Sequence, residues 1–122
     1  SLSGRLALTA PVTFGRLHVA PLVTSFLKQH PDLSVELLLL DRVVDLLEEG
    51  LDLAVRIGEL PDSSLVAIPL GKVRRVCCAS AAYLRRHGTP REPDRLMSTR
   101  VRALLDWLVP RLRESLASAA AG

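Results

Sequence analysis

Residues 4–15 read GRLALTAPVTFG, and the fold expected for the chain starts from this stretch. Residues 5–9 form a short run of the β type, which the Ala10-Pro11 pair ends because proline has no amide to donate to a sheet. Helical periodicity follows, with apolar side chains three and four positions apart over residues 19–27. The stretch therefore predicts a strand that leads through a short loop into a helix.

Two prolines shape that first helix. Pro21 lies inside the helical pattern, where its ring and its missing amide predict a loose first turn or a kink. His30 precedes Pro31, and the residue before a proline disfavours the helical backbone. The helix is therefore expected to end at His30.

Strand and helix signals alternate along the rest of the chain. Residues 33–40 are apolar at nearly every position, which predicts a strand covered on both faces. Asp41 is expected to cap a short helix through Glu49, with Gly50 at the position that ends it. Residues 53–57 predict another buried strand. The order is completed by a β-rich stretch at 65–78, a helix at 80–86, a polar linker at 89–94 and a last amphipathic helix.

This order predicts an α/β fold with a mostly parallel sheet and helices on both faces. The expected core consists of strand residues, namely Leu6, Leu8, Val35, Leu37, Leu39, Ala54, Val55 and Ile57. The chain of 122 residues has the length of one domain, and its 48% of hydrophobic residues excludes an intrinsically disordered protein.

Composition also predicts the cellular compartment of the chain and argues against a membrane span and against nucleic-acid binding. Apolar runs such as residues 37–40 are far shorter than the roughly 20 residues of a membrane span, and no secretory signal pattern is visible. Cys77 and Cys78 are adjacent and make poor disulfide partners, which favours a reducing cytoplasm. Basic residues exceed acidic ones by 16 − 13 = 3, and aromatic residues reach only 3%. Direct binding of nucleic acid is therefore not expected.

Motifs for catalysis are missing from the sequence. It contains neither a glycine-rich phosphate loop nor the glycine-flanked serine of a nucleophile elbow. The three histidines, His18, His30 and His87, share no metal-ligand spacing with one another or with the cysteines. We therefore expect no enzymatic activity, no cofactor and no metal.

One arrangement predicts a ligand site, because ligands of open α/β sheets bind beyond the carboxyl ends of the strands. Helix amides and the Thr13 hydroxyl suit a carboxylate or another small anion, and the fork of the Arg56 guanidinium suits the same group. The candidate residues are Ala10, Pro11, Val12, Thr13, Phe14, Arg56, Ile57 and Gly58. A plainer alternative stays open, in which Thr13 caps the helix and Arg56 pairs with Asp52, Glu59 or Asp62.

The chain resembles the effector-binding domain of LysR-type transcriptional regulators in a series of ordered segments. These are residues 4–15, 20–22, 26–27, 30–33, 41–42, 44–46, 49–50, 52–58, 62–67, 79–80, 83–84, 87–88 and 90. The resemblance implies a fold like that of type II periplasmic binding proteins, with two α/β subdomains on a hinge. It also implies that the candidate residues line one half of a small-molecule effector site.

The resemblance changes character after Leu96. Residues 97–108 resemble the family's C-terminal helix, which normally follows a second subdomain. The resemblance therefore implies a first regulatory subdomain, made of residues 1–96 and completed by a helix within 97–122, from which the second subdomain is deleted. Such a chain is expected to bind its effector weakly and to form a homo-oligomer. It would reach DNA only through the helix-turn-helix of its parent protein.

Two other functions remain open from the sequence. The chain also suits a small protein-interaction module of flavodoxin-like shape, in which the same loop binds an acidic group of a partner. A fragment of a metabolic enzyme is the third interpretation, and no motif supports it.

Overall fold

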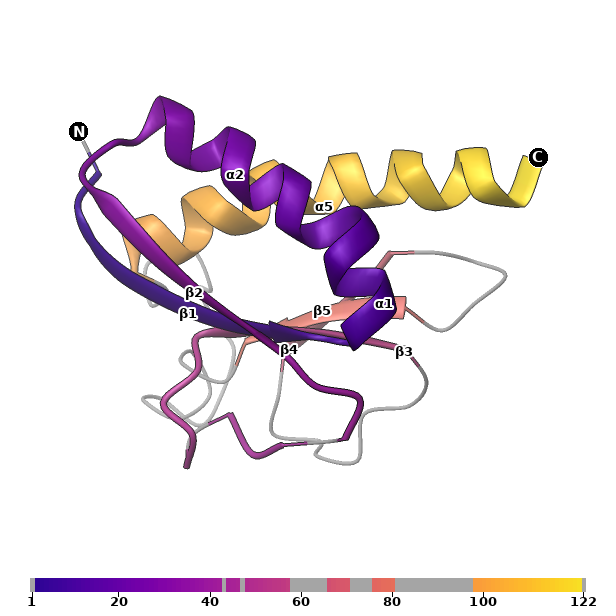
Figure 1. Cartoon of the computed structure of the whole chain (residues 1–122), viewed down its shortest axis with the longest axis horizontal. Helices are drawn as coiled ribbons and strands as arrows, with labels where there is room; N and C mark the ends of the chain where they lie inside the picture. The colour runs from indigo at the N-terminus through magenta and orange to yellow at the C-terminus, as the bar shows by residue number, and fades with distance from the viewer. Residues whose placement is uncertain are drawn as a thin grey trace.

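The computed structural model describes residues 2–42, 44–46, 48–57, 66–70, 76–80 and 98–121. Within these ranges the chain forms a five-stranded sheet with a helical layer against it (Figure 1). The helix expected at 80–86 and the linker at 89–94 lie outside the described residues, apart from Ser80, the last residue of a strand.

The sheet is mostly parallel, as predicted. Its strands are β1 (Gly4–Ala10), β2 (Leu33–Leu39), β3 (Leu53–Ile57), β4 (Val66–Pro69) and β5 (Val76–Ser80), in the spatial order β2-β1-β3-β5-β4. The inner strand β1 pairs in parallel with both β2 and β3. β5 alone among the described strands runs the other way, because it is antiparallel to both β3 and β4. The carboxyl ends of β1, β2 and β3 therefore meet at one edge.

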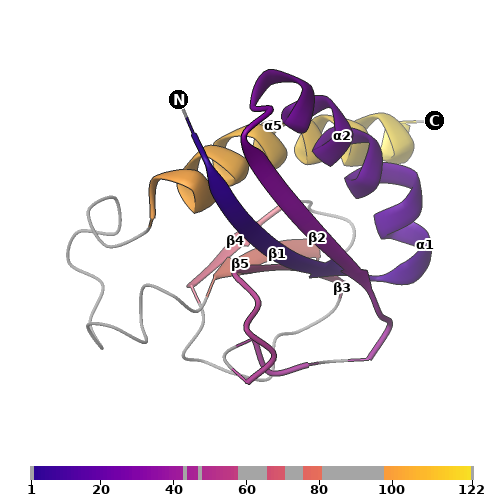
Figure 2. The same cartoon turned by 60° about the vertical axis from the view of Figure 1, so that its left-hand side comes forward.

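The helical layer consists of two rods. The first combines α1 (Val12–Phe14), the π-turn η1 (Gly15–Val19) and α2 (Ala20–Gln29), and the second is α5 (Thr99–Ala121). Figures 1 and 2 show α2 and α5 on the same face of the sheet. The described part of residues 41–52 lies on the opposite face, where it forms bends and turns.

The irregularity expected near Pro21 is confirmed as the π-turn. The amide of Ala20 donates to the carbonyl of Gly15, five residues earlier, instead of the usual four. Pro21 then occupies the first turn of α2, where a missing amide costs little. The helix ends at Gln29, as the His30-Pro31 pair predicts.

The main core lies between the helical layer and the sheet. Strand residues Leu6, Leu8, Leu53 and Val55 face the helices and are almost completely buried. The helices cover them with Val19, Phe26, Leu104, Leu108 and Leu112. A smaller cluster of Leu46, Leu51 and Ala54 packs on the other face of β1 and β3, with Ala7 and Val44 beside it.

The last helix is tied to the rest of the fold by side chains that donate to backbone carbonyls. Trp107 Nε1 donates to the Leu22 carbonyl of α2 at 3.0 Å. Arg113 Nη2 donates to the Pro69 carbonyl at the end of β4 at 2.9 Å. These bonds attach α5 both to the first helical rod and to the far strand of the sheet. The predicted C-terminal helix is therefore confirmed, with Pro110 inside it.

Two expectations about the second strand and the segment after it are wrong. β2 is covered on one face only, because the smaller cluster packs beneath β1 and β3 and leaves Ser34, Glu36 and Leu38 exposed. The helix expected from Asp41 to Glu49 is replaced by bends and turns at its described positions. Gly50, expected to end that helix, instead lies in a turn with φ of +68°, a backbone that glycine adopts without strain.

The expected core is also partly wrong. Val35, Leu37 and Leu39 are only half-buried, because they belong to the outer strand β2. Ala54 is buried in the smaller cluster, on the face opposite the helices. Ile57 is 44% exposed because it is the last residue of β3, beyond the area that the helices cover.

Candidate functional site

The predicted ligand edge is formed by the ends of three strands and the start of a helix. β1 ends at Ala10, β2 at Leu39 and β3 at Ile57, and the first helical rod begins at Val12. The Leu40 amide donates to the Ala10 carbonyl at 2.9 Å, which continues the pairing of β1 and β2 beyond their last residues. This edge is the position at which parallel α/β sheets bind ligands.

The candidate residues fall into exposed and buried groups. Thr13 is exposed on the first helical turn, and Val12 beside it has an exposed fraction of 40%. Ile57 is exposed at the end of β3. Ala10 and Phe14 are buried and support the loop from inside. Gly58 lies outside the described residues. Among the described candidate residues, one hydroxyl and two aliphatic side chains are therefore exposed to solvent.

Arg56 is buried on the face of the sheet that the helices do not cover. Only 7% of its surface is exposed. Its Nη1 donates to the Leu40 carbonyl and its Nη2 to the Asp41 carbonyl, both at 3.2 Å. The guanidinium thus binds two consecutive carbonyls of the segment that follows β2.

The start of the helix is capped from a distant part of the sequence. The Asp41 Oδ1 atom accepts a hydrogen bond from the Val12 amide at 3.0 Å, and Pro11 at the cap position supplies no side-chain bond. An acidic group at this place also interacts favourably with the helix dipole. The cap is therefore Asp41, not Thr13.

Asp52 has a different partner from the one that the plainer alternative assigns to it. Its Oδ2 atom accepts the Ala7 amide at 2.9 Å, and its own amide donates to the Ala7 carbonyl at 2.7 Å. Glu59 and Asp62, the other proposed partners of Arg56, lie outside the described residues. Within the described chain, Arg56 is held by backbone carbonyls and not by the Asp52 carboxylate.

Sequence reasoning missed Asp41 at this edge. Its signal was present, because the residue follows directly after a predicted strand. That signal was assigned to a helix expected immediately downstream, whereas the carboxylate caps a helix that begins 29 positions earlier.

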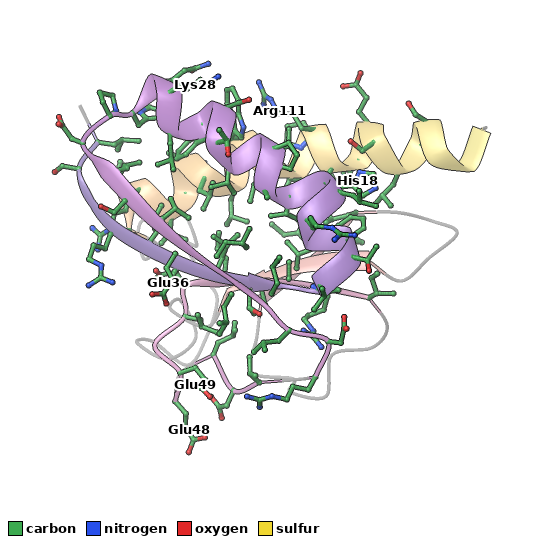
Figure 3. The ribbon with its side chains drawn as sticks, in the orientation of Figure 1. His18, Lys28, Glu36, Glu48, Glu49 and Arg111 are labelled. Carbon is green, nitrogen blue, oxygen red and sulfur yellow. The ribbon has the colours of Figure 1, made fainter. Side chains whose placement is uncertain are left out.

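The described histidines pack against aromatic rings. The His18 ring lies 4.9 Å from that of Phe14, at the base of the edge, and the His30 ring lies 4.5 Å from that of Phe26, both in tilted arrangements. Figure 3 shows Glu48 and Glu49 on the side of the sheet opposite His18, Lys28 and Arg111. Across the described ranges, no group of three or more His, Cys, Asp or Glu residues is placed to hold a metal ion. No described helix is long and apolar enough to cross a membrane.

Comparison of the sequence with known proteins gives consistent matches. The family described as LysR substrate binding domain matches residues 1–101. The uncharacterized HTH-type transcriptional regulator YhjC of Escherichia coli (strain K12) is 42% identical over 98 residues, covering 80% of this chain and 33% of that protein. An uncharacterized HTH-type transcriptional regulator of Haemophilus influenzae is 44% identical over 96 residues, covering 79% of this chain and 33% of that protein.

Solved structures of the same family share the fold. The regulatory domain of CrgA, a LysR-type transcriptional regulator from Neisseria meningitidis, has a TM-score of 0.50 and 28% identity. That match covers 74% of this chain and 44% of the CrgA chain. The effector domain of the transcriptional regulator AmpR of Pseudomonas aeruginosa has a TM-score of 0.50 and 30% identity, covering 55% of this chain and 33% of that chain.

These relatives are named as transcriptional regulators, and no enzyme family is indicated. The chain spans about a third of the length of these curated relatives. The family match extends over the strands β1 to β5, the first helical rod and the start of α5. Because the family model matches residues 1–101 and the α/β sheet is like that of periplasmic binding proteins, the chain belongs to the LysR substrate-binding domain family, the effector-binding domain of LysR-type transcriptional regulators.

Proposed function

We propose that this chain senses a small carboxylate-like effector at the edge formed by residues 10–14 and 56–58. The observation that carries the proposal is the convergence of three strand ends with a helix start, next to the guanidinium of Arg56. The Thr13 hydroxyl is exposed there, and the positive end of the helix dipole, which the Asp41 carboxylate already caps at Val12, favours an anion. The aliphatic surfaces of Val12 and Ile57 would contact the carbon skeleton of the ligand.

Binding at this edge is expected to be weak. Ligand pockets usually bury about 70–90% of the ligand surface, whereas this edge provides one wall. Each charge-assisted hydrogen bond contributes roughly 1.5–3 kcal/mol before ordering costs are subtracted. Arg56 already uses two of its nitrogens on the Leu40 and Asp41 carbonyls, which reduces what it offers to a ligand.

Titration with acetate and succinate, followed by backbone amide NMR shifts, tests the site. We expect the shifts to cluster at residues 10–15 and 56–58 and to weaken in Thr13→Val. Thr24→Val is the matched control, because the Thr24 hydroxyl donates to the Ala20 carbonyl of its own helix at 3.0 Å, away from the edge. Shifts that cluster elsewhere, or that are equal in Thr13→Val and Thr24→Val, would contradict the proposed site. A response to acidic peptides alone would favour the protein-interaction module instead.

We also propose that residues 1–96 and the helix within 97–122 form one regulatory subdomain, from which the second subdomain of the family is deleted. The packing of α5 supports this arrangement: Leu104, Leu108 and Leu112 are fully buried against the main core. Arg100 Nε donates to the Arg5 carbonyl at 2.9 Å and so attaches the start of α5 to β1. In this proposal the chain itself makes no contact with DNA, and DNA binding belongs to a helix-turn-helix of the parent protein.

A third part of the proposal is that the chain forms a homodimer. The first helical rod keeps an exposed apolar position at Leu17, which has an exposed fraction of 58%, and β4 is an outer strand of the described sheet. Exposed apolar groups and unpaired strand edges favour association. The dimer would form through residues 16–29, through the edge at 65–78, or by exchange of the C-terminal helix between chains.

Sedimentation over a range of concentrations measures this association. We expect a shift from monomer to dimer as the concentration rises, because the net charge of +3 is too small to keep copies apart. Leu17→Glu should weaken the dimer if the first helical rod forms the interface. A strict monomer at high concentration would contradict the proposed homodimer.

A further inference from the structure

Three segments far apart in the sequence are joined by side-chain hydrogen bonds at the ligand edge. Arg56 in β3 donates to the carbonyls of Leu40 and Asp41, which follow β2. The Asp41 carboxylate in turn accepts the amide of Val12 at the start of the first helical rod. We call these four residues, Arg56, Leu40, Asp41 and Val12, the helix-start network.

The network depends on the shape of the guanidinium. Arg56 is nine-tenths buried, and a buried charge must be compensated by hydrogen bonds. The planar fork of arginine reaches two consecutive carbonyls with two different nitrogens, whereas the ammonium of lysine is a single point charge. Binding both carbonyls fixes the backbone of the Leu40–Asp41 peptide, and with it the place from which the Asp41 side chain extends.

We propose that Arg56 and Asp41 are positioning residues that together set the order of the helix start. Within the described residues, the Arg56 guanidinium donates to the carbonyls of residues 40 and 41 and not to Val12, so it acts on Val12 through Asp41. Loss of either side chain releases the Val12 amide and loosens the first turn, where the Gly15 amide donates to the Pro11 carbonyl at 2.7 Å. The order of the 10–14 loop is thus controlled from a different strand.

The functional meaning of the network rests on the proposed effector site. A ligand carboxylate that draws the guanidinium away from the Leu40 and Asp41 carbonyls would also move the Asp41 cap. Binding at Arg56 would then also change the first turn of the helix through Asp41, in addition to any direct contact with that turn. The network consists only of residues of this chain, so its test needs no ligand.

Amide hydrogen exchange of the ligand-free chain measures the network directly. In Asp41→Ala we expect exchange at Val12 and Gly15 to rise about ten-fold, the size expected for one lost hydrogen bond. Arg56→Gln should produce a rise of similar size at the same amides, although it removes no atom that contacts them. The double variant should exchange no faster than the faster single variant, because both changes break the same chain of bonds. Asp41→Asn keeps an acceptor oxygen and should restore most of the protection.

A second arginine provides the matched control. Arg113 also donates to a backbone carbonyl with two nitrogens, at the far strand β4, so Arg113→Gln should leave exchange at residues 12–15 unchanged. If Arg56→Gln does not fold, Arg56→Lys replaces it, and a smaller rise at Val12 is expected. Unchanged exchange at Val12 in the folded Arg56 variant, or additive effects in the double variant, would overturn the proposal. If acetate does not bind, the hydrogen-exchange result still supports the network, and only the proposed effector site is contradicted.

Discussion

Leu8→Ala is expected to lower the free energy of unfolding by about 2–5 kcal/mol, the range for truncating a fully buried leucine. Leu8 has no exposed surface and lies in the inner strand β1, opposite Leu37 of β2 and Leu53 of β3. The truncation leaves a cavity that the flanking strands and the helical layer cannot close without breaking other contacts. Urea denaturation followed by circular dichroism measures the change.

Alanine substitutions at two other leucines provide comparisons, because their side chains are buried to different extents. Leu37→Ala should cost less than Leu8→Ala, because Leu37 is only half-buried in the outer strand β2. Leu17→Ala should change stability by less than about 0.5 kcal/mol, because this leucine is largely exposed. Equal losses in all three variants would contradict the described core. A gradual transition with strong binding of the dye ANS would contradict a complete, cooperative subdomain.

Gly15→Val is expected to lower the free energy of unfolding by about 1–3 kcal/mol through overpacking. Gly15 has an ordinary helical backbone, with φ of −63° and ψ of −44°, so its conformation does not require glycine. Glycine is favoured here by the lack of space for a side chain. A Cβ atom would press against Leu39 Cδ2 and would lie 3.0 Å from the Cβ of buried Ala10. The same denaturation experiment measures the loss, and amide NMR shifts should change at the ends of β1 and β2.

Gly50 is the contrasting control. It has φ of +68°, a backbone that asparagine tolerates better than most residues, and no atom lies within 4 Å of an added Cβ. Gly50→Asn should therefore cost much less than Gly15→Val. If Gly15→Val were neutral, the helix would have to lie farther from the strand ends than the structure places it.

Several elements were predictable because their signals are local. These signals are the β-type run of residues 5–9, the prolines at 21 and 31 and the apolar spacing of the last helix. Pro21 indicated an irregular turn, and a π-turn ends two residues before it. Gly50 was expected to end a helix that does not form, and it has a positive φ in a turn. The candidate edge was also placed by sequence, because parallel strands bring their carboxyl ends together.

The sequence by itself determined the first strand–helix–strand unit, the parallel start of the sheet and the family, because each is recorded in local periodicity or in ordered motifs. Only the tertiary structure decided which face of β2 is covered, since an apolar run such as residues 37–40 looks the same whether one face or two are packed. It also decided the partners of Asp41 and Arg56. A carboxylate after a strand can cap any helix that starts nearby in space, and here the convergence of strand ends placed it at Val12, not at a helix of its own.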